Sequence, residues 1–124
     1  MAITVILFYS DGCGHCRTFK PEWNKVKTAA RTDGLRNVKF IEYNAEQDKE
    51  KFVEAKISGI PAVHIIYSKG TFEYTGARNA RSLYDKILDV VEEDEEQQSK
   101  KFQKPGNNNS KVYNSKVYNN KPYY

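Results

Sequence analysis

Residues 8–23 read FYSDGCGHCRTFKPEW, and they join an apolar run to a helical pattern. The run, residues 2–9, is continuous in aliphatic, β-branched and aromatic side chains, which predicts a strand buried on both faces of a sheet. Beyond the junction, four apolar side chains recur at helical spacing and predict an amphipathic helix over residues 14–31. These four are Phe19, Trp23, Val26 and Ala30.

Two cysteines, Cys13 and Cys16, enclose Gly14 and His15 where this strand meets the start of the helix. A thiol at that place meets the positive end of the helix dipole and unpaired N–H groups, which stabilise its thiolate form. His15 can add a further positive charge beside the dithiol. We therefore expect Cys13 to be the nucleophile and Cys16 to be the resolving thiol.

The same residues allow three other interpretations. Zinc usually takes four ligands, and the soft candidates are Cys13, Cys16, His15 and His64, with His15 held between the two cysteines. A c-type haem needs His directly after the second cysteine, where Arg17 stands, so the motif excludes it. Two unreactive buried thiols are the third reading. We predict no metal site and no cofactor other than a redox-active Cys13–Cys16 disulfide.

Downstream patterns extend the sheet on both sides of a second helix. Residues 38–43 read as a strand, and Asn44 is expected to cap a helix over residues 45–56. Because a strand, helix and strand follow in order, the first two strands should pair in parallel. Two of the helix side chains are expected to face inward. They are Phe52 and Ala55.

Residues 62–96 predict a hairpin and a final helix. Residues 62–67 and 71–75 are short strand-like runs whose connection suits an antiparallel hairpin. A final helix should begin near Asn79 and reach the acidic run 92–96, which we interpret as solvated surface.

Charge divides the 124-residue chain into one domain, residues 1–96, and a tail, residues 97–124. All 16 acidic residues lie in the first part beside 14 of the 20 basic ones, and the tail holds the six remaining lysines. The tail's low apolar content and its SKVYN repeat predict a disordered low-complexity segment. The alternative is a short docking arm; we do not expect the tail to bind nucleic acid.

No apolar run approaches the roughly 18 to 20 residues that a membrane span needs, so no membrane partner is expected. The opening residues lack a basic region and a small-residue cleavage site, which predicts a cytoplasmic location. Repeats rich in Asn and Lys suggest an AT-rich genome, and a component of the virion of a large DNA virus is the alternative.

Residues 8–23 resemble the thioredoxin-like proteins, specifically the catalytic domains of protein disulfide isomerase. The segments GIP at residues 59–61 and YTGAR at residues 74–78 are similar to further family motifs. The resemblance implies a thioredoxin-like α/β fold, with a four-stranded mixed sheet flanked by three helices. It also implies that Pro61 is cis, that Ile60 and Pro61 meet an extended substrate, and that Arg78 lowers the pKa of Cys16.

The sequence departs from the family pattern in three places. Leu7 stands where many members carry a buried acid, and His64 stands where we expect its lysine partner. We hypothesise that His64 lies beside Leu7 and modulates the thiol pKa values by taking over proton transfer. Gly12 replaces a tryptophan, which removes an aromatic surface beside the dithiol.

These features predict a thiol–disulfide oxidoreductase, a reductase or isomerase, with a role in cell redox homeostasis. Its expected partners are proteins with disulfides or thiols, and glutathione or a thioredoxin-reductase-type protein as the reductant. The alternative is a non-catalytic thioredoxin-fold binding module whose tail docks a partner.

Overall fold

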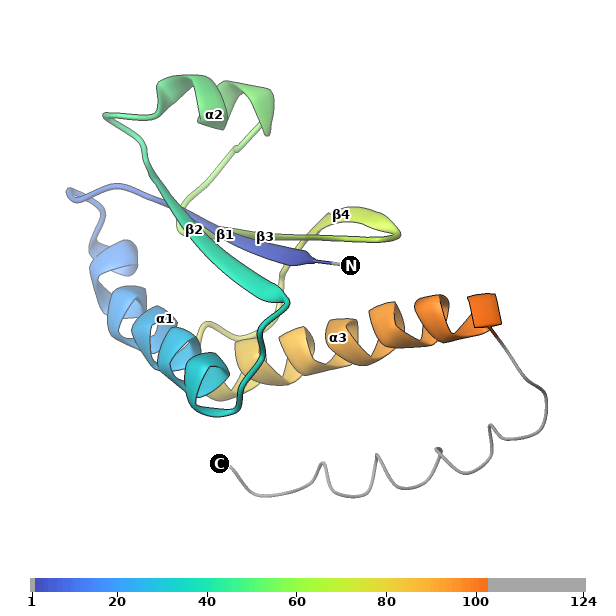
Figure 1. The fold of residues 1–124 in the computed structure, drawn as a ribbon. Coiled ribbons are helices and arrows are strands. Elements are labelled where there is room, and N and C mark those ends of the chain that lie inside the picture. The colour runs from blue at the N-terminus through green and yellow to red at the C-terminus, as the bar shows by residue number, and fades with distance from the viewer. Residues whose placement is uncertain (1, 103–124) are drawn as a thin grey trace.

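The computed structural model describes residues 2–102 of the chain, with side chains up to residue 95 (Figure 1). Four strands form one sheet in the order β2-β1-β3-β4. Their bounds are β1 Ile3–Tyr9, β2 Val38–Asn44, β3 Ala62–Tyr67 and β4 Gly70–Glu73. β1 pairs in parallel with β2 and antiparallel with β3, and β3 pairs antiparallel with β4. The predicted mixed sheet, including its parallel pair and its hairpin, is confirmed.

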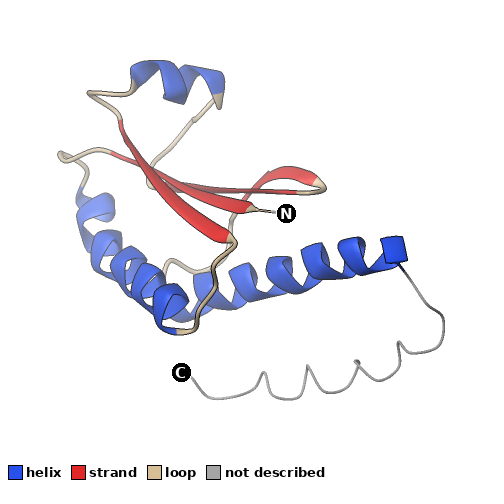
Figure 2. Cartoon of the chain, in the orientation of Figure 1, coloured by secondary structure: helices blue, strands red, loops and turns tan. Residues whose placement is uncertain are grey.

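Three helices cover the two faces of the sheet (Figure 2). Helices α1 (Gly14–Thr32) and α3 (Ala80–Phe102) lie on one face, and the short helix α2 (Lys49–Glu54) lies on the other. The main core is between the sheet and the α1–α3 layer, where Trp23 is fully buried. A smaller cluster faces α2 and includes Phe8, with Phe52 and Ala55 packed against it as expected. Side chains of β1 enter both clusters, because neighbouring strand residues point to opposite faces.

Helix α2 begins later than the sequence predicts. Its N-cap is Asp48, and Asn44 is instead the last residue of β2. The Asn44 side chain turns back to accept the N–H of Glu46 at 2.8 Å, and Asp48 accepts the N–H of Asn44 at 2.9 Å. This turn uses the capping oxygen of Asn44 locally, so the prediction that Asn44 caps a helix over residues 45–56 is wrong.

The acidic run in α3 is also different from its prediction. Asp94 is 3% exposed and accepts the N–H of Ser68 at 3.4 Å, while Glu93 pairs with Lys69 at 2.6 Å. Both acids therefore hold the turn between β3 and β4 against α3, and they are not simply solvated surface.

The helix α3 continues to Phe102, so residues 97–102 are helical although the sequence assigned them to the tail. The rest of the predicted tail, residues 103–124, lies outside the described residues. Within residues 2–102, no helix is both long and apolar enough to cross a membrane.

Candidate functional site

The dithiol is built by the start of helix α1. Cys13 is its N-cap residue, with an extended backbone at φ −92° and ψ 119°. The Cys13 Sγ atom accepts a hydrogen bond from the main-chain N–H of Cys16 at 3.1 Å. Sulfur thus occupies the place that a serine or aspartate oxygen usually takes at a helix N-terminus. Both cysteines are free thiols; Cys13 is half-buried, whereas Cys16 is 2% exposed.

The environment of Cys16 keeps this thiol protonated at neutral pH. Burial, and after it the hydrogen bond with Cys13, raise the pKa of Cys16 to about 11. A backbone hydrogen bond with Ser10 and the positive charge of Arg78 oppose this shift in the pKa. The two cysteines differ in access, and the high pKa of Cys16 disfavours its thiolate, which divides their chemical roles.

The loop before β3 lies against the dithiol. The Ile60–Pro61 peptide bond is cis, as the family resemblance implied. The Ile60 carbonyl oxygen is 4.0 Å from Cys13 Sγ, within the range of a weak S–H···O hydrogen bond. A groove of about 250 Å³ continues from Pro61 to Arg78 and is floored in part by Phe19. The structure thus brings Cys13, Cys16, Ile60, Pro61 and Arg78 to one end of the sheet.

A polar cluster supports the loop between β1 and α1, and the sequence did not point to it. Asn44 donates its side-chain N–H to Asp11 Oδ2 at 3.3 Å, and Ser10 Oγ donates to Glu46 Oε2 at 3.1 Å. Arg17 Nη1 donates to the Asp11 carbonyl at 3.2 Å. The only sequence signal was a turn-forming Asn at the end of a strand, which we interpreted as a helix cap.

The two histidines lie apart from each other. His15 is exposed beside the dithiol, as expected for a residue in the first turn of α1. His64 pairs with Ile6 across β1 and β3, and its ring lies 5.1 Å from the ring of Phe8. Leu7 pairs with Val63 and packs on the opposite face of the sheet. The expectation that His64 lies beside Leu7 is therefore wrong, because neighbouring strand residues alternate between faces.

An acid on β2, Glu42, stands next to Leu7 in the sheet register. Its carboxylate accepts hydrogen bonds from Trp23 Nε1 at 2.8 Å and Lys27 Nζ at 2.7 Å, and it lies 3.5 Å from Lys20 Nζ. Burial raises the pKa of Glu42, but the bonds from Lys27 and Trp23 outweigh it and lower the pKa below its ordinary value. The sequence did not point to Glu42, because its hydrogen-bond partners, Trp23 and Lys27, lie on a different element, α1.

Among the side chains that the structure describes, residues 2–95, no three His, Cys, Asp or Glu lie close enough together to hold a metal ion.

The family model described as thioredoxin matches residues 1–89. The chain is 29% identical over 87 residues to a probable protein disulfide-isomerase of Caenorhabditis elegans, covering 70% of this chain and 14% of that protein. It is 31% identical over 93 residues to a thioredoxin domain-containing protein of Acanthamoeba polyphaga mimivirus, covering 73% of this chain and 26% of that one. The chain thus spans about a quarter or less of these two relatives.

Solved structures share the fold. The J-Trx1 fragment of ERdj5 superposes with a TM-score of 0.66 at 25% identity, over 73% of this chain and 44% of that one. Zinc-bound human ERp44 gives a TM-score of 0.65 at 21% identity, over 70% of this chain and 26% of that one. The predicted thioredoxin-like fold is confirmed by these superpositions together with the sheet order.

Proposed function

This chain belongs to the thioredoxin family, and we propose that it exchanges thiols and disulfides with other proteins through Cys13 and Cys16. The observation that carries the proposal is the asymmetry of the pair. Cys13 is the accessible sulfur, receives the Cys16 N–H at 3.1 Å and lies beside the Ile60 carbonyl, whereas Cys16 is buried.

In the first step, the Cys13 thiolate attacks one sulfur of a substrate disulfide. A new S–S bond joins Cys13 to the substrate, and the second substrate sulfur leaves as a thiolate that takes up a proton. The Cys16 N–H and the helix dipole favour the charged form of the attacking sulfur. His15 is exposed on the open side of the site, where it adds positive charge whenever its imidazole is protonated.

In the second step, Cys16 loses its proton and attacks Cys13 Sγ. The mixed disulfide breaks, the Cys13–Cys16 disulfide forms, and the substrate sulfur that was bonded to Cys13 leaves as a thiol. The substrate gains two electrons and two protons, and the dithiol loses them. Arg78 assists this step, because its charge favours the Cys16 thiolate in a buried place that otherwise disfavours it.

We propose that the substrate binds as an extended chain beside Ile60 and Pro61. The Ile60 carbonyl is already within 4.0 Å of the reacting sulfur, so a backbone paired there holds a substrate cysteine next to Cys13. The groove of about 250 Å³ beyond Pro61 offers room for a neighbouring substrate side chain.

A reductant must return the Cys13–Cys16 disulfide to the dithiol after each turnover. We propose glutathione or a dithiol reductase for this task, because either can reduce a dithiol–disulfide couple by thiol exchange. The direction of exchange depends on the reduction potential. A value near about −270 mV makes the protein a reductase, and one near about −180 mV makes it an oxidase or isomerase.

Insulin reduction with dithiothreitol, combined with titration against glutathione buffers, tests the proposal. The wild-type protein should accelerate insulin precipitation, and Cys13→Ser should reduce the rate to the dithiothreitol background. Lys49→Gln, an exposed change on α2, serves as the matched control and should keep the wild-type rate. A wild-type rate equal to background would favour the non-catalytic binding module instead.

A further inference from the structure

Strand β2 forms an open edge of the sheet in the part of the chain that the structure describes. Its pairing with β1 is bounded by two hydrogen bonds: Ile3 N–H to the Asn37 carbonyl at 2.7 Å, and Ala45 N–H to the Tyr9 carbonyl at 2.8 Å. In a parallel ladder, alternate residues of a strand direct both their N–H and C=O groups to the same neighbour. The two bonds therefore fix which residues of β2 face outward.

The inward set bonds to β1 and comprises Lys39, Ile41 and Tyr43. The outward set comprises Val38, Phe40 and Glu42. The next outward-facing residue, Asn44, already donates its N–H to the Asp48 side chain, and its carbonyl accepts the N–H of Gln47. Three residues thus offer six main-chain groups to an added strand.

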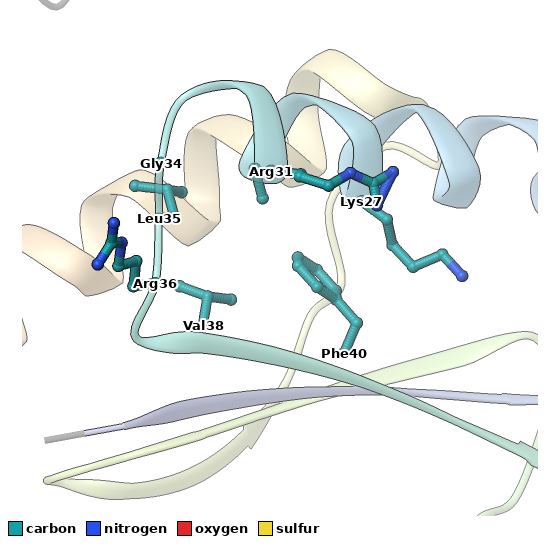
Figure 3. A pocket seen from close by; sticks show the side chains of 8 residues that line it. Lys27, Arg31, Gly34, Leu35, Arg36, Val38 and Phe40 are labelled. Atoms are coloured by element: carbon teal, nitrogen blue, oxygen red, sulfur yellow. The ribbon is translucent and has the colours of Figure 1, made fainter.

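Two of the outward residues, Val38 and Phe40, also border a hollow of about 490 Å³ between β2 and the C-terminal half of α1 (Figure 3). Val38 and Phe40 rise from β2 toward Arg31 and Lys27 on α1, and Leu35 closes the end nearest the loop. Val38, Phe40 and Leu35 are only half-buried, so the hollow has an incompletely covered apolar floor.

The rim of this hollow is positively charged. Arg31 and Arg36 are exposed, and no carboxylate of the described residues pairs with either guanidinium. Lys27 is also on the rim, but its charge is engaged by Glu42 at 2.7 Å. The two free guanidinium groups therefore favour a carboxylate-bearing ligand beside the apolar floor.

We propose that β2 binds an extended acidic segment of a partner protein, which adds a strand to the open edge. Residues of paired strands that lie opposite each other point to the same face of a sheet. The partner residues opposite Val38 and Phe40 therefore lie over the hollow, where apolar side chains cover the floor. Carboxylates two residues further along the partner strand lie on the same face and reach Arg31 and Arg36. Main-chain hydrogen bonds provide affinity, and the charged hollow determines which partner binds.

Two alternative occupants of the β2 edge come from this protein itself, and the positive charge of each makes it less suitable for the positive rim. Residues 97–124 contain six lysines and no acid, so they bring positive charge to a positive rim. A second copy pairing through its own β2 brings Arg31, Arg36 and Lys39 close to their equivalents.

The site lies at the opposite end of the 19-residue helix α1 from Cys13, about 25 Å away, so it is independent of the dithiol.

The test uses the full chain and a synthetic peptide of about eight residues. On one face of its strand, two central apolar residues stand between two glutamates, and the residues of the other face are threonine. A matched peptide carries lysine in place of every glutamate. We expect the glutamate peptide alone to bind in fluorescence anisotropy. Arg36→Glu should weaken binding at least about fivefold, and Lys49→Glu, which reverses one charge on α2, should leave it unchanged.

Hydrogen exchange by NMR tests the strand geometry. Bound peptide should slow exchange at the amides of Val38, Phe40 and Glu42 and leave the already paired Lys39, Ile41 and Tyr43 unchanged. Equal binding of both peptides, or slowed exchange confined to other residues, would overturn the proposal. Protection of the same three amides in the free protein, as monomer or dimer, would also overturn it, because the chain would then cover its own edge.

Discussion

The main-chain N–H of Cys16 points at the Sγ atom of Cys13 across 3.1 Å. This bond belongs to the backbone of α1, so it remains when the Cys16 side chain is replaced. It favours the thiolate of Cys13, since a charged acceptor takes a stronger hydrogen bond than a neutral one. The Cys16 sulfur itself is 2% exposed and has a pKa of about 11.

Single cysteine variants should therefore behave differently. In Cys16→Ser, Cys13 should react with iodoacetamide within about threefold of its wild-type rate and form long-lived mixed disulfides with substrate. In Cys13→Ser, Cys16 should be alkylated at least about 100-fold more slowly than Cys13, because it is both buried and protonated. Mass spectrometry of the modified peptides measures both rates. Comparable alkylation of the two cysteines would contradict this division of roles.

Arg78 should act on the second step of exchange. Its positive charge opposes the effect of burial on the pKa of Cys16, so Arg78→Gln should raise that pKa further. We expect the mixed disulfide to resolve about threefold more slowly at pH 7, with the rise in rate displaced to higher pH. Rapid acid quenching over a pH series measures this rate. The idea fails if Lys49→Gln, which removes an exposed charge on α2, slows resolution equally.

Local patterns predicted the elements that position the dithiol. β1 and α1 were evident because their apolar residues follow the repeats of a buried strand and an amphipathic helix. The choice between Asn44 and Asp48 as helix cap was not decidable in this way. Both residues carry a capping oxygen, and only the turn after β2 shows that Asn44 is already engaged.

Relations between distant elements were harder to predict. Whether His64 shares a face with Leu7 depends on the register of β1 with β3, and a shift of one residue reverses the answer. The acidic run read as solvated because its partner, Ser68, lies on a hairpin far away in the sequence. Glu42 was overlooked for the same reason, since its lysine and tryptophan partners come from α1.

His64 packs on the face of the sheet opposite to α1, so we expect His64→Leu to leave insulin reduction within about twofold of wild type. Stability should change little, because leucine is an apolar residue of similar size on a half-buried site. The pH dependence of the rate is the sharper measurement. A displaced pH profile in His64→Leu would show that this imidazole does take part in proton transfer.

Gly76 is required by the position of Tyr74. A Cβ atom at residue 76 would lie 2.6 Å from Tyr74 Oη, which donates a hydrogen bond to the Ala77 carbonyl at 2.7 Å. Gly76→Ala should displace the ring, break this bond and lower the free energy of unfolding by about 1–2 kcal/mol.

Urea unfolding of Gly76→Ala beside Gly59→Ala provides the comparison. A Cβ atom at residue 59 meets nothing within 4 Å, so that control should change stability by less than about 0.5 kcal/mol. In a Tyr74→Phe background, the effect of Gly76→Ala should shrink, because the hydrogen bond is already absent. An undiminished effect there would mean that the hydrogen bond is not what Gly76 protects.

Glu42 should make stability depend on pH. Although burial raises its pKa, the bonds from Lys27 and Trp23 hold the pKa below the ordinary value of 4.5. A carboxylate whose pKa is lower in the folded than in the unfolded state stabilises the fold above the unfolded value. That stabilisation is lost as the pH falls through the folded value. We expect Glu42→Gln to lower the free energy of unfolding by about 1–3 kcal/mol at pH 7.

The difference between wild type and Glu42→Gln should diminish as the pH falls below about 4.5, where the wild-type carboxyl becomes neutral too. Urea titrations at several pH values measure it. The matched control is Glu54→Gln on α2, where the side chain is 70% exposed and 4.0 Å from Lys51, so stability should hardly change. If the difference in stability between wild type and Glu42→Gln stays constant down to pH 3, shape rather than charge sets the contribution of Glu42. The charged and the protonated forms of Glu42 would then stabilise the fold equally, relative to glutamine.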